Sequence, residues 1–390
     1  MSAFREFYQK TFERLAVRAA AYNESLKREE QKLLAPFFDM MADLNEGGKM
    51  LRGVLVVLGY QIASRAAADG RQIAEASGAE GGTDEDPAPD GGLAAADDAA
   101  LAFEIFQTGV LIHDDIIDRA RTRRGKPTMT VRYEESLKER RMAAPSQSGH
   151  LAESAAICAG DYLITASNLI LTRACGTHPR GAAVIRAFDE VILDTIRGEL
   201  LDVVLPMEMT DPARSKEEAD ALLHKAVNDI YHLKTARYSV IGPLHLGLLL
   251  GGMHKDQTAQ LDAMADDLGI AFQIKDDLLG IYADEQELGK DIGSDISEFK
   301  QTVLYAYVRM REPEAYKQLL TVYGKPAITF EELQMVQQLF EDCGARRFAE
   351  TEMERHFASA ERAVDAMTFV DERDKAILKE FISYNRERRK

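Results

Sequence analysis

Cysteine and proline are scarce in this chain of 390 residues, which contains three cysteines and 11 prolines. Cys158, Cys175 and Cys343 are scattered without the spacing of a metal site or a disulfide framework. This distribution predicts reduced, structural thiols, as is usual inside cells. The small number of prolines allows long helices throughout the chain.

Long hydrophobic runs are also missing from the sequence. The longest apolar stretch, 239–253, is interrupted by His245 and by several glycines. It is shorter than the roughly 18 to 20 apolar residues that cross a bilayer. The N-terminal residues are mixed and charged, unlike those of a signal peptide. We therefore expect a cytoplasmic protein without a transmembrane segment.

Basic residues are outnumbered, with 48 Lys and Arg against 65 Asp and Glu and a formal net charge of −17. This deficit argues against nucleic acid as a partner, because a phosphate backbone is bound by basic surfaces. Part of the acid lies in a stretch rich in Ala, Gly, Asp and Pro at about 66–98. Its low hydrophobicity and its helix breakers predict a disordered acidic insertion.

Helical patterns dominate the remaining sequence. Apolar residues recur at intervals of three and four, as in Phe4, Phe7, Tyr8, Phe12 and Leu15. The same helical character resumes after the acidic stretch, which therefore does not resemble a linker between domains. The pattern predicts an all-α protein with a single domain over 1–390.

A first acidic motif reads Leu-Ile-His-Asp-Asp-Ile-Ile-Asp over 111–118. On a helix, Asp114 and Asp118 lie one turn apart on one face, and Asp115 lies beside them. Three carboxylates within an apolar helix repel one another and resist desolvation, so a positive charge must compensate them. Hard divalent cations prefer such oxygen ligands. The alternative is a solvated acidic face, which the apolar neighbours disfavour.

A second motif, Phe-Gln-Ile-Lys-Asp-Asp-Leu-Leu-Gly over 272–280, places Asp276 and Asp277 after another apolar helical run. Two such motifs can face each other across a cavity in a helical bundle. Mg²⁺ is usually shared between protein carboxylates and substrate phosphates, so a diphosphate is the expected ligand. Arg and Lys bind phosphate oxygens directly, and they occur in short runs at 47–52, 123–128 and 234–235.

Together these motifs resemble the trans-isoprenyl diphosphate synthases, which include farnesyl and geranylgeranyl diphosphate synthases. The similarity runs in order from about Gly47 to Thr302, interrupted by the acidic insertion. It implies the isoprenoid synthase fold, a single-domain helical bundle around a deep central cavity, usually found as a homodimer.

The resemblance also implies roles for individual residues. The five motif aspartates, Asp114, Asp115, Asp118, Asp276 and Asp277, would bind about three Mg²⁺ ions and the allylic diphosphate and, with Lys234, serve in catalysis. The residues matching the isopentenyl diphosphate site are Lys49, Arg52 and Arg124. Those matching positions near the allylic diphosphate or the reacting carbons are Arg123, Lys234, Thr235, Tyr238, Gln273, Lys290 and Lys300.

Two positions depart from the family pattern. Gly280 stands where many members carry a third aspartate, which the second motif tolerates if its first two aspartates are the principal ligands. Gln107 stands where many members place a histidine near isopentenyl diphosphate. Glutamine can donate a hydrogen bond but has no charge, so binding could be weaker. The basic C-terminal tail, 386–390, is interpreted as a solvated helix end; closure of the site and contact with anionic lipid are the alternatives.

The implied chemistry is head-to-tail condensation of isopentenyl diphosphate with an allylic prenyl diphosphate. Loss of diphosphate would leave an allylic cation, which the double bond of isopentenyl diphosphate would attack. The resulting cation would lose a proton, by family analogy to the released diphosphate, and yield a linear trans-prenyl diphosphate. Mg²⁺ and cationic side chains would stabilise the departing diphosphate, and the apolar helices would exclude water.

Product length depends on the helix that carries the first motif. The small residues Gly109 and Val110 precede Asp114 and would open the cavity, while Phe106 and Phe103 lie deeper and could form its floor. We therefore expect a product of twenty carbons or somewhat longer. Three alternatives are a farnesyl diphosphate synthase, a terpene cyclase and a non-catalytic partner subunit. The retained aspartates and the basic runs favour a condensing enzyme.

Overall fold

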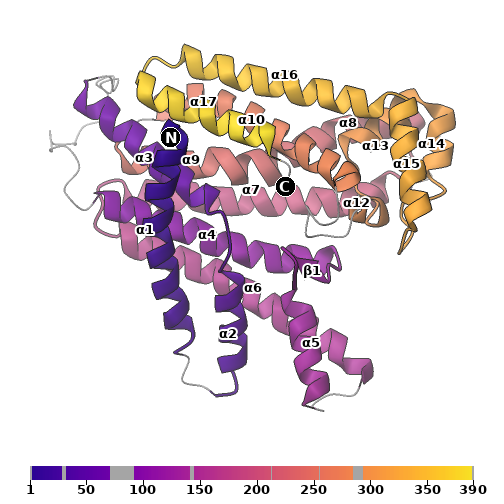
Figure 1. Cartoon of the computed structure of the whole chain (residues 1–390), viewed down its shortest axis with the longest axis horizontal. Helices are drawn as coiled ribbons and strands as arrows, with labels where there is room; N and C mark the ends of the chain where they lie inside the picture. Colours follow the sequence, from indigo (N-terminus) through magenta and orange to yellow (C-terminus); the bar gives the residue numbers. More distant parts are fainter. Residues whose placement is uncertain are drawn as a thin grey trace. The chain divides into compact units, whose positions relative to one another are not determined.

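A computed structural model describes residues 2–28, 32–70, 92–140, 145–211, 213–253, 255–283 and 293–388 (Figure 1). Nearly all of the described elements are helices, which confirms the predicted all-α class. The two described strands, β1 (Thr122–Arg123) and β2 (Lys126–Pro127), form a short antiparallel hairpin. This hairpin follows the first acidic motif directly.

The chain divides into two compact units, each made of segments that are not contiguous in sequence. The first contains 1–188, 243–258 and 368–377, and the second contains 189–242, 259–367 and 378–390. The prediction of a single domain stays a prediction. The first acidic motif belongs to the first unit and the second motif to the second unit.

In the first unit, α4 packs against α3 and α6, and α5 packs against α6 (Figure 1). The core lies along these contacts, where nearly every residue on the inner faces of α3 and α4 is buried. The unit contains α1 (Ala3–Leu26), α2 (Ala35–Leu44), α3 (Leu51–Ala68), α4 (Gly92–Ile117), α5 (Met129–Glu139), α6 (Pro145–Cys175), the start of α7 (Gly181–Glu208), α9 (Gly242–Leu250), the start of α10 (Lys255–Tyr282) and the start of α17 (Glu372–Glu387).

The second unit contains most of α7 and α10 and a set of shorter helices. A capping box, in which Ser215 and Glu218 each bond the other's backbone amide, begins α8, and Thr329 begins α15 in the same way. The further helices are α8 (Lys216–Ile230), η1 (Tyr231–Ile241), α12 (Ser294–Ser297), α13 (Val303–Arg311), α14 (Pro313–Leu319), α15 (Phe330–Asp342) and α16 (Ala345–Ala366).

One of these segments, η1, is a π-helix inserted between two α-helices. Such segments are rare and often occur at functional sites. Three predicted site residues, Lys234, Thr235 and Tyr238, lie in η1. The apolar periodicity of the sequence gave no sign of this change in helical geometry.

The predicted acidic insertion is shorter than expected from composition. Helix α3 continues to Ala68 and α4 begins at Gly92, so both ends of the stretch 66–98 are helical. Asp97 is buried and pairs with Arg14 at 3.1 Å, which explains how an acidic segment joins a packed helix. Residues 71–91 lie outside the described part of the chain.

Helix α6 bears on the expectation that no segment crosses a membrane. By length and composition alone, Ser146–Cys175 could cross a membrane, and 33% of its most apolar part is buried. Core helices of globular proteins pass the same test, and α6 packs against α4 and α5. That the chain has no transmembrane segment stays a prediction.

Candidate active site

The first acidic motif lies at the end of α4, where the helix turns into the hairpin. The amide of Asp118 donates to the carbonyl of Asp114 at 2.8 Å, and the amide of Ala120 donates to that of Asp115 at 2.8 Å. Arg119 then adopts a left-handed conformation with φ of 52°. Asp114 and Asp115 therefore belong to the last helical turn, whereas Asp118 lies just beyond it.

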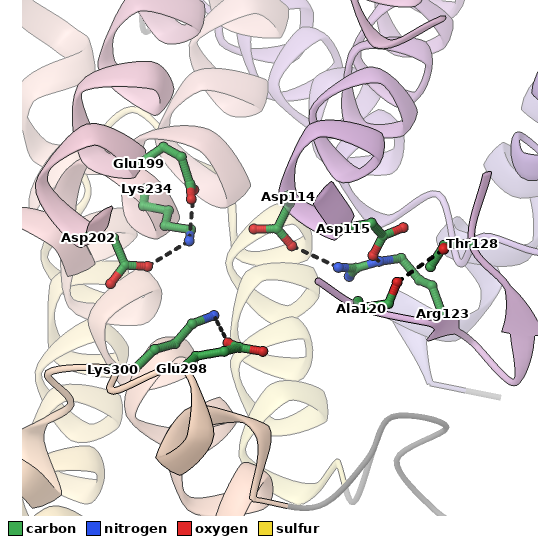
Figure 2. A network of polar contacts seen from close by, with 10 residues as sticks. All are labelled: Asp114, Asp115, Ala120, Arg123, Thr128, Glu199, Asp202, Lys234, Glu298 and Lys300. Carbon is green, nitrogen blue, oxygen red and sulfur yellow. Dashed lines mark hydrogen bonds and ion pairs between the residues drawn. The ribbon is translucent and has the colours of Figure 1, made fainter. Parts of the chain in front are cut away.

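The hairpin returns an arginine to the motif. Arg124 and Gly125 form its two-residue turn, and both have the positive φ angles that tight hairpins require. Figure 2 shows the guanidinium of Arg123 between two carboxylates, donating to Asp115 at 2.5 Å and to Asp114 at 2.7 Å. Two of the predicted metal ligands, Asp114 and Asp115, thus both accept hydrogen bonds from the Arg123 guanidinium.

The electrostatics of this cluster favour a bound positive charge. The side chain of Asp115 is only 6% exposed. Burial alone would lower the pKa of Arg123, but the charges of Asp114 and Asp115 outweigh it and raise this pKa above its usual value. Arg123 therefore stays protonated and acts as the counter-ion of both carboxylates.

This arrangement suits Mg²⁺ shared with a substrate. Within the described residues, no three acidic, histidine or cysteine side chains form a group that could hold a metal. The described side chains alone therefore do not provide a complete set of ligands for the ion. Mg²⁺ usually takes one or two carboxylates and completes its shell with water and phosphate oxygens. Asp114 and Asp115, already gathered around one positive charge, match that donor set.

The second acidic motif lies on α10 in a more elaborate polar setting. Asp277 is 3% exposed and accepts hydrogen bonds from the Tyr231 hydroxyl and, at 2.9 Å, from the Gln273 amide. Thr235 donates to Gln273 at 2.5 Å. Burial, with a smaller contribution from the charge of Asp295, raises the pKa of Asp277 to about 7. Asp277 is thus a buried carboxylate with both oxygens bonded inside the protein.

Asp276, by contrast, contacts the C-terminal tail. Arg388 forms an ion pair with Asp276 and places its guanidinium carbon 3.8 Å from the centre of the Phe272 ring. Arg386 pairs with Glu361 at 2.9 Å. The interpretation of the tail as a solvated helix end is therefore wrong for Arg386 and Arg388, because carboxylates and an aromatic ring outcompete water. Residues 389 and 390 lie outside the described residues.

The missing third aspartate of the second motif has a structural counterpart. A Cβ atom at Gly280 would lie 2.8 Å from a carboxylate oxygen of Asp295. The carboxylate of Asp295 therefore occupies the space beside Gly280, and its charge is felt at Asp277. The second motif was expected to tolerate Gly280 if its first two aspartates are the principal ligands, and the approach of Asp295 supplies a physical reason for a residue without a side chain at this position.

Two predicted lysines of the second unit pair with acids (Figure 2). Lys234 contacts Glu199 and Asp202 on α7, each at 2.8 Å, and Lys300 contacts Glu298 at 3.0 Å. Gly198 lets α7 approach Lys234 closely, because a Cβ there would lie 2.6 Å from the Lys234 amide nitrogen. Tyr238 is buried in η1, and Lys290 lies outside the described residues.

The residues predicted to bind isopentenyl diphosphate gather at the start of α3. The carbonyl of Lys49 accepts from the Tyr8 hydroxyl at 2.8 Å, and Arg52 lies in the first helical turn. A Cβ at Gly48 would lie 3.4 Å from the Arg124 guanidinium, so the hairpin turn reaches this loop. Gln107 is half-buried on α4.

A further acid in this region was not predicted. Glu104 accepts a hydrogen bond from the Gly53 amide at 2.8 Å. The available signal was a single acid within the apolar run 99–106 of α4, which no motif drew attention to.

The chain-length residues require one correction. A Cβ at Gly109 would lie 2.8 Å from the Ile164 side chain and 3.0 Å from the Gly160 carbonyl, so Gly109 packs against α6 instead of opening a cavity. Phe103 and Phe106 are fully buried and pack edge-to-face against each other and against Phe188.

The polyprenyl synthetase family model matches residues 35–342, most of the chain. A geranylgeranyl diphosphate synthase from Sulfolobus acidocaldarius is 32% identical over 239 residues, which cover 60% of this chain and 63% of that enzyme. A farnesyl pyrophosphate synthase from Zea mays is 28% identical over 293 residues, which cover 74% of this chain and 71% of that enzyme. The match to the Sulfolobus enzyme thus spans less than two thirds of its length.

Among solved structures, a geranylgeranyl pyrophosphate synthase from Corynebacterium glutamicum, complexed with isoprenyl diphosphate and magnesium, superposes with a TM-score of 0.80. It is 25% identical, and the alignment covers 99% of both chains. This likeness confirms the predicted isoprenoid synthase fold, and the family match confirms the resemblance read from the motifs.

Proposed function

The chain belongs to the polyprenyl synthetase family, and from this premise we propose that it condenses isopentenyl diphosphate head to tail with an allylic prenyl diphosphate. The products would be a linear trans-prenyl diphosphate and diphosphate. The observation that carries the proposal is that Asp114 and Asp115, at the end of α4, both pair with the guanidinium of Arg123. This pair, beside a basic hairpin, is suited to a metal-bound diphosphate.

Asp114 and Asp115, with Asp118 and the aspartates of the second motif, would hold about three Mg²⁺ ions, the number implied by the family. When bound, Mg²⁺ supplies a Lewis acid that stabilises charge on the departing diphosphate.

The side chains of the protein would orient and stabilise the two substrates. Arg123 carries a fixed positive charge beside the motif, and it can exchange its carboxylate partners for phosphate oxygens. Lys234, held by Glu199 and Asp202, supplies a positioned ammonium group. Buried helices around the motif would exclude water, which would otherwise quench an allylic cation. The proposed chemistry needs no protein nucleophile.

For product length, we propose twenty carbons or somewhat longer, with farnesyl length as the alternative. Val110 lies one turn before Asp114 on the same side of α4, and Phe106 lies one turn deeper. The buried aromatic cluster of Phe103, Phe106 and Phe188 is a candidate floor, since its T-shaped ring contacts stabilise the packing.

Val110→Phe tests this floor. We expect a product shorter by at least one isoprene unit, because a ring at this position would block the space above Phe106. Products are identified by mass after dephosphorylation. Gly109→Phe is the contrasting variant: its ring would collide with α6, so we expect loss of about 1–3 kcal/mol of stability or more instead of a shorter product. An unchanged product from Val110→Phe would remove Val110 from the cavity wall.

We also propose that the protein is a cytoplasmic homodimer. On α7, exposed apolar side chains recur at intervals of three and four residues: Leu193, Ile196, Leu200, Val203 and Met207. Such a stripe on one helix matches the seam of two packed helices, and a second copy of the chain is its natural occupant. Sedimentation of the purified protein gives the mass that tests this proposal.

The activity is tested by incubating purified protein with Mg²⁺, isopentenyl diphosphate and each allylic starter in turn. A linear prenyl series identified by mass would support the proposal, and the longest product would define the chain length. Absence of product with every starter, from protein whose folding is verified by circular dichroism, would point to a subunit that requires a catalytic partner.

A further inference from the structure

Glu104 is a half-buried acid in the middle of α4, ten residues or about three turns before Asp114. Its neighbours Phe103, Ile105 and Phe106 are all buried. A carboxylate in such surroundings is costly unless it is bonded to donors or paired with cations. The carboxylate of Glu104 therefore requires hydrogen-bond donors or positive charges close to it.

Its partners are the start of α3 and two arginines. The Gly53 amide donates to Glu104 at 2.8 Å. Burial raises the pKa of Glu104, while hydrogen bonds from the Gly53 and Arg52 amides and the charges of Arg52 and Arg124 oppose that shift. Glu104 thus accepts from the start of α3, where Arg52 lies and where the Arg124 guanidinium approaches Gly48, and the charges of both arginines act on it.

Glu104 lies close to the start of α3, and this approach depends on glycine at position 53. Helix α3 begins after Met50, which has φ of 49° and provides no side-chain cap. Glu104 supplies the missing acceptor from another helix, since the first amides of a helix lack intrahelical partners. A Cβ at Gly53 would lie 3.3 Å from Glu104 Cγ and 3.0 Å from the Leu15 side chain. A larger residue at position 53 would therefore displace the carboxylate.

We propose that Glu104 is a positioning residue for the isopentenyl diphosphate site, orienting Arg52 and Arg124 so that both grip one diphosphate. This inference rests on the proposed function. A guanidinium that is already oriented loses less side-chain entropy when it binds phosphate. Glu104 touches neither substrate nor metal in this role and acts through the two arginines.

Two substitutions separate the role of Glu104 as an acceptor at the start of α3 from the role of its negative charge. Glu104→Gln keeps an oxygen that can accept from the Gly53 amide but removes the charge that faces the arginines, and Glu104→Ala removes both. Isopentenyl diphosphate is titrated calorimetrically without an allylic substrate, and KM is measured for each substrate. We expect Glu104→Gln to raise Kd and KM for isopentenyl diphosphate about tenfold, with kcat and KM for the allylic substrate changed less than about twofold.

Asp97→Asn is a matched control. Asp97 lies seven residues earlier on α4, is buried, and also pairs with two arginines, Arg14 at 3.1 Å and Arg18 at 3.7 Å. Those arginines belong to α1 and have no assigned substrate. We expect Asp97→Asn to lower the melting temperature while leaving both KM values unchanged. If it raised KM for isopentenyl diphosphate as much as Glu104→Gln does, the effect would be general destabilisation and the proposal would fail.

A double-mutant cycle with Arg124→Gln tests the route. If Glu104 acts through Arg124, adding Glu104→Gln to Arg124→Gln should weaken binding by much less than tenfold. Fully additive effects of the two substitutions would overturn the inference. An unchanged Kd in Glu104→Gln would also overturn it, and so would a lowered Kd, which would mean that the carboxylate merely repels the ligand. Wild-type protein that binds isopentenyl diphosphate but forms no product would contradict the proposed function alone. Wild-type protein that binds neither this ligand nor inorganic diphosphate would overturn both.

Discussion

The two acidic motifs are similar in sequence but held in different ways. Asp114 and Asp115 share Arg123, which follows them within ten residues on a short hairpin. Asp276 instead contacts Arg388, which is 112 residues away, and Asp277 is bonded to Tyr231 and Gln273. A local counter-ion can form with the hairpin itself, whereas the second motif acquires its counter-ion only when distant helices have packed.

The supporting contacts differ in the same sense. Helix α4 approaches α6 through glycines: a Cβ at Gly109 or at Gly160 would collide with the facing helix. His113, next to Asp114, contacts the Ile157 carbonyl at 3.0 Å across this approach. Helix α10 is tied to η1 by polar pairs such as Thr235 with Gln273. The first motif thus depends on close backbone packing, and the second on side-chain hydrogen bonds.

The largest expected effect comes from removing the carboxylates that pair with arginines, Asp114 with Arg123 and Asp276 with Arg388. We expect Asp114→Asn and Asp276→Asn each to lower kcat/KM by about a thousandfold, since losing ~4 kcal/mol of transition-state stabilisation has that effect. Asp277→Asn should cost less, about 10- to 100-fold, because its oxygens are bonded within the protein. Steady-state kinetics over a range of Mg²⁺ concentrations measure all three.

Asp43→Asn is the control for these variants, because Asp43 pairs with Arg132 at the surface of the first unit. Its kinetics should match those of the wild type. If Asp277→Asn were as damaging as Asp276→Asn, Asp277 would have to leave Tyr231 during turnover, and the distinction between the two aspartates would be lost.

A smaller effect is expected because Arg123 and Arg388 compete with metal ions for the aspartates of the two motifs. Arg123 pairs with two carboxylates, and Arg388 pairs with one. We expect Arg123→Gln to tighten Mn²⁺ binding without substrate by about tenfold, and Arg388→Gln by about threefold. Electron paramagnetic resonance of free Mn²⁺ gives the affinities. Activity should nevertheless fall in Arg123→Gln, since the guanidinium is also assigned to the diphosphate.

Arg355→Gln removes an exposed arginine paired with Glu352 and controls for overall charge. Its Mn²⁺ affinity should equal that of the wild type. Equal affinities in all variants would show that neither guanidinium competes with metal, and the proposed difference between local and distant counter-ions would have no consequence for binding.

The smallest effect tests the polar support of α10. His232 contacts Asp266 at 2.5 Å, and this hydrogen bond raises the pKa of His232 above its usual value. The stabilisation is therefore complete below the unfolded pKa of about 6.5 and is lost as pH rises through the raised folded value. Because the pair is partly exposed, His232→Gln should cost less than about 1 kcal/mol at about pH 5.5 and almost nothing at about pH 9.

Thermal unfolding at the two pH values measures this difference. His224→Gln, at an exposed histidine on α8, controls for the replacement of a histidine by glutamine. An equal loss for His232→Gln at both pH values would mean that packing, not the charge of the imidazolium, accounts for its contribution.

Several features of this protein could be predicted because they depend on residues close together in sequence. Apolar spacing predicted the helices, and the two aspartate pairs with their basic neighbours predicted the family. Composition failed at 92–98, where acidic residues lie within a helix because Asp97 meets Arg14 from another segment. It also failed at Gly109, whose small size serves helix packing instead of a cavity.

The sequence by itself determined the helical class, the family and the residue types of the candidate site, because periodicity and motif spacing are local properties of the chain. Only the tertiary structure decided which charges are compensated and by what: Arg388 on Asp276, Tyr231 on Asp277, and Glu104 beside the start of α3. The physical reason is that electrostatic and hydrogen-bond energies depend on distance in space, and these partners are brought together only by packing.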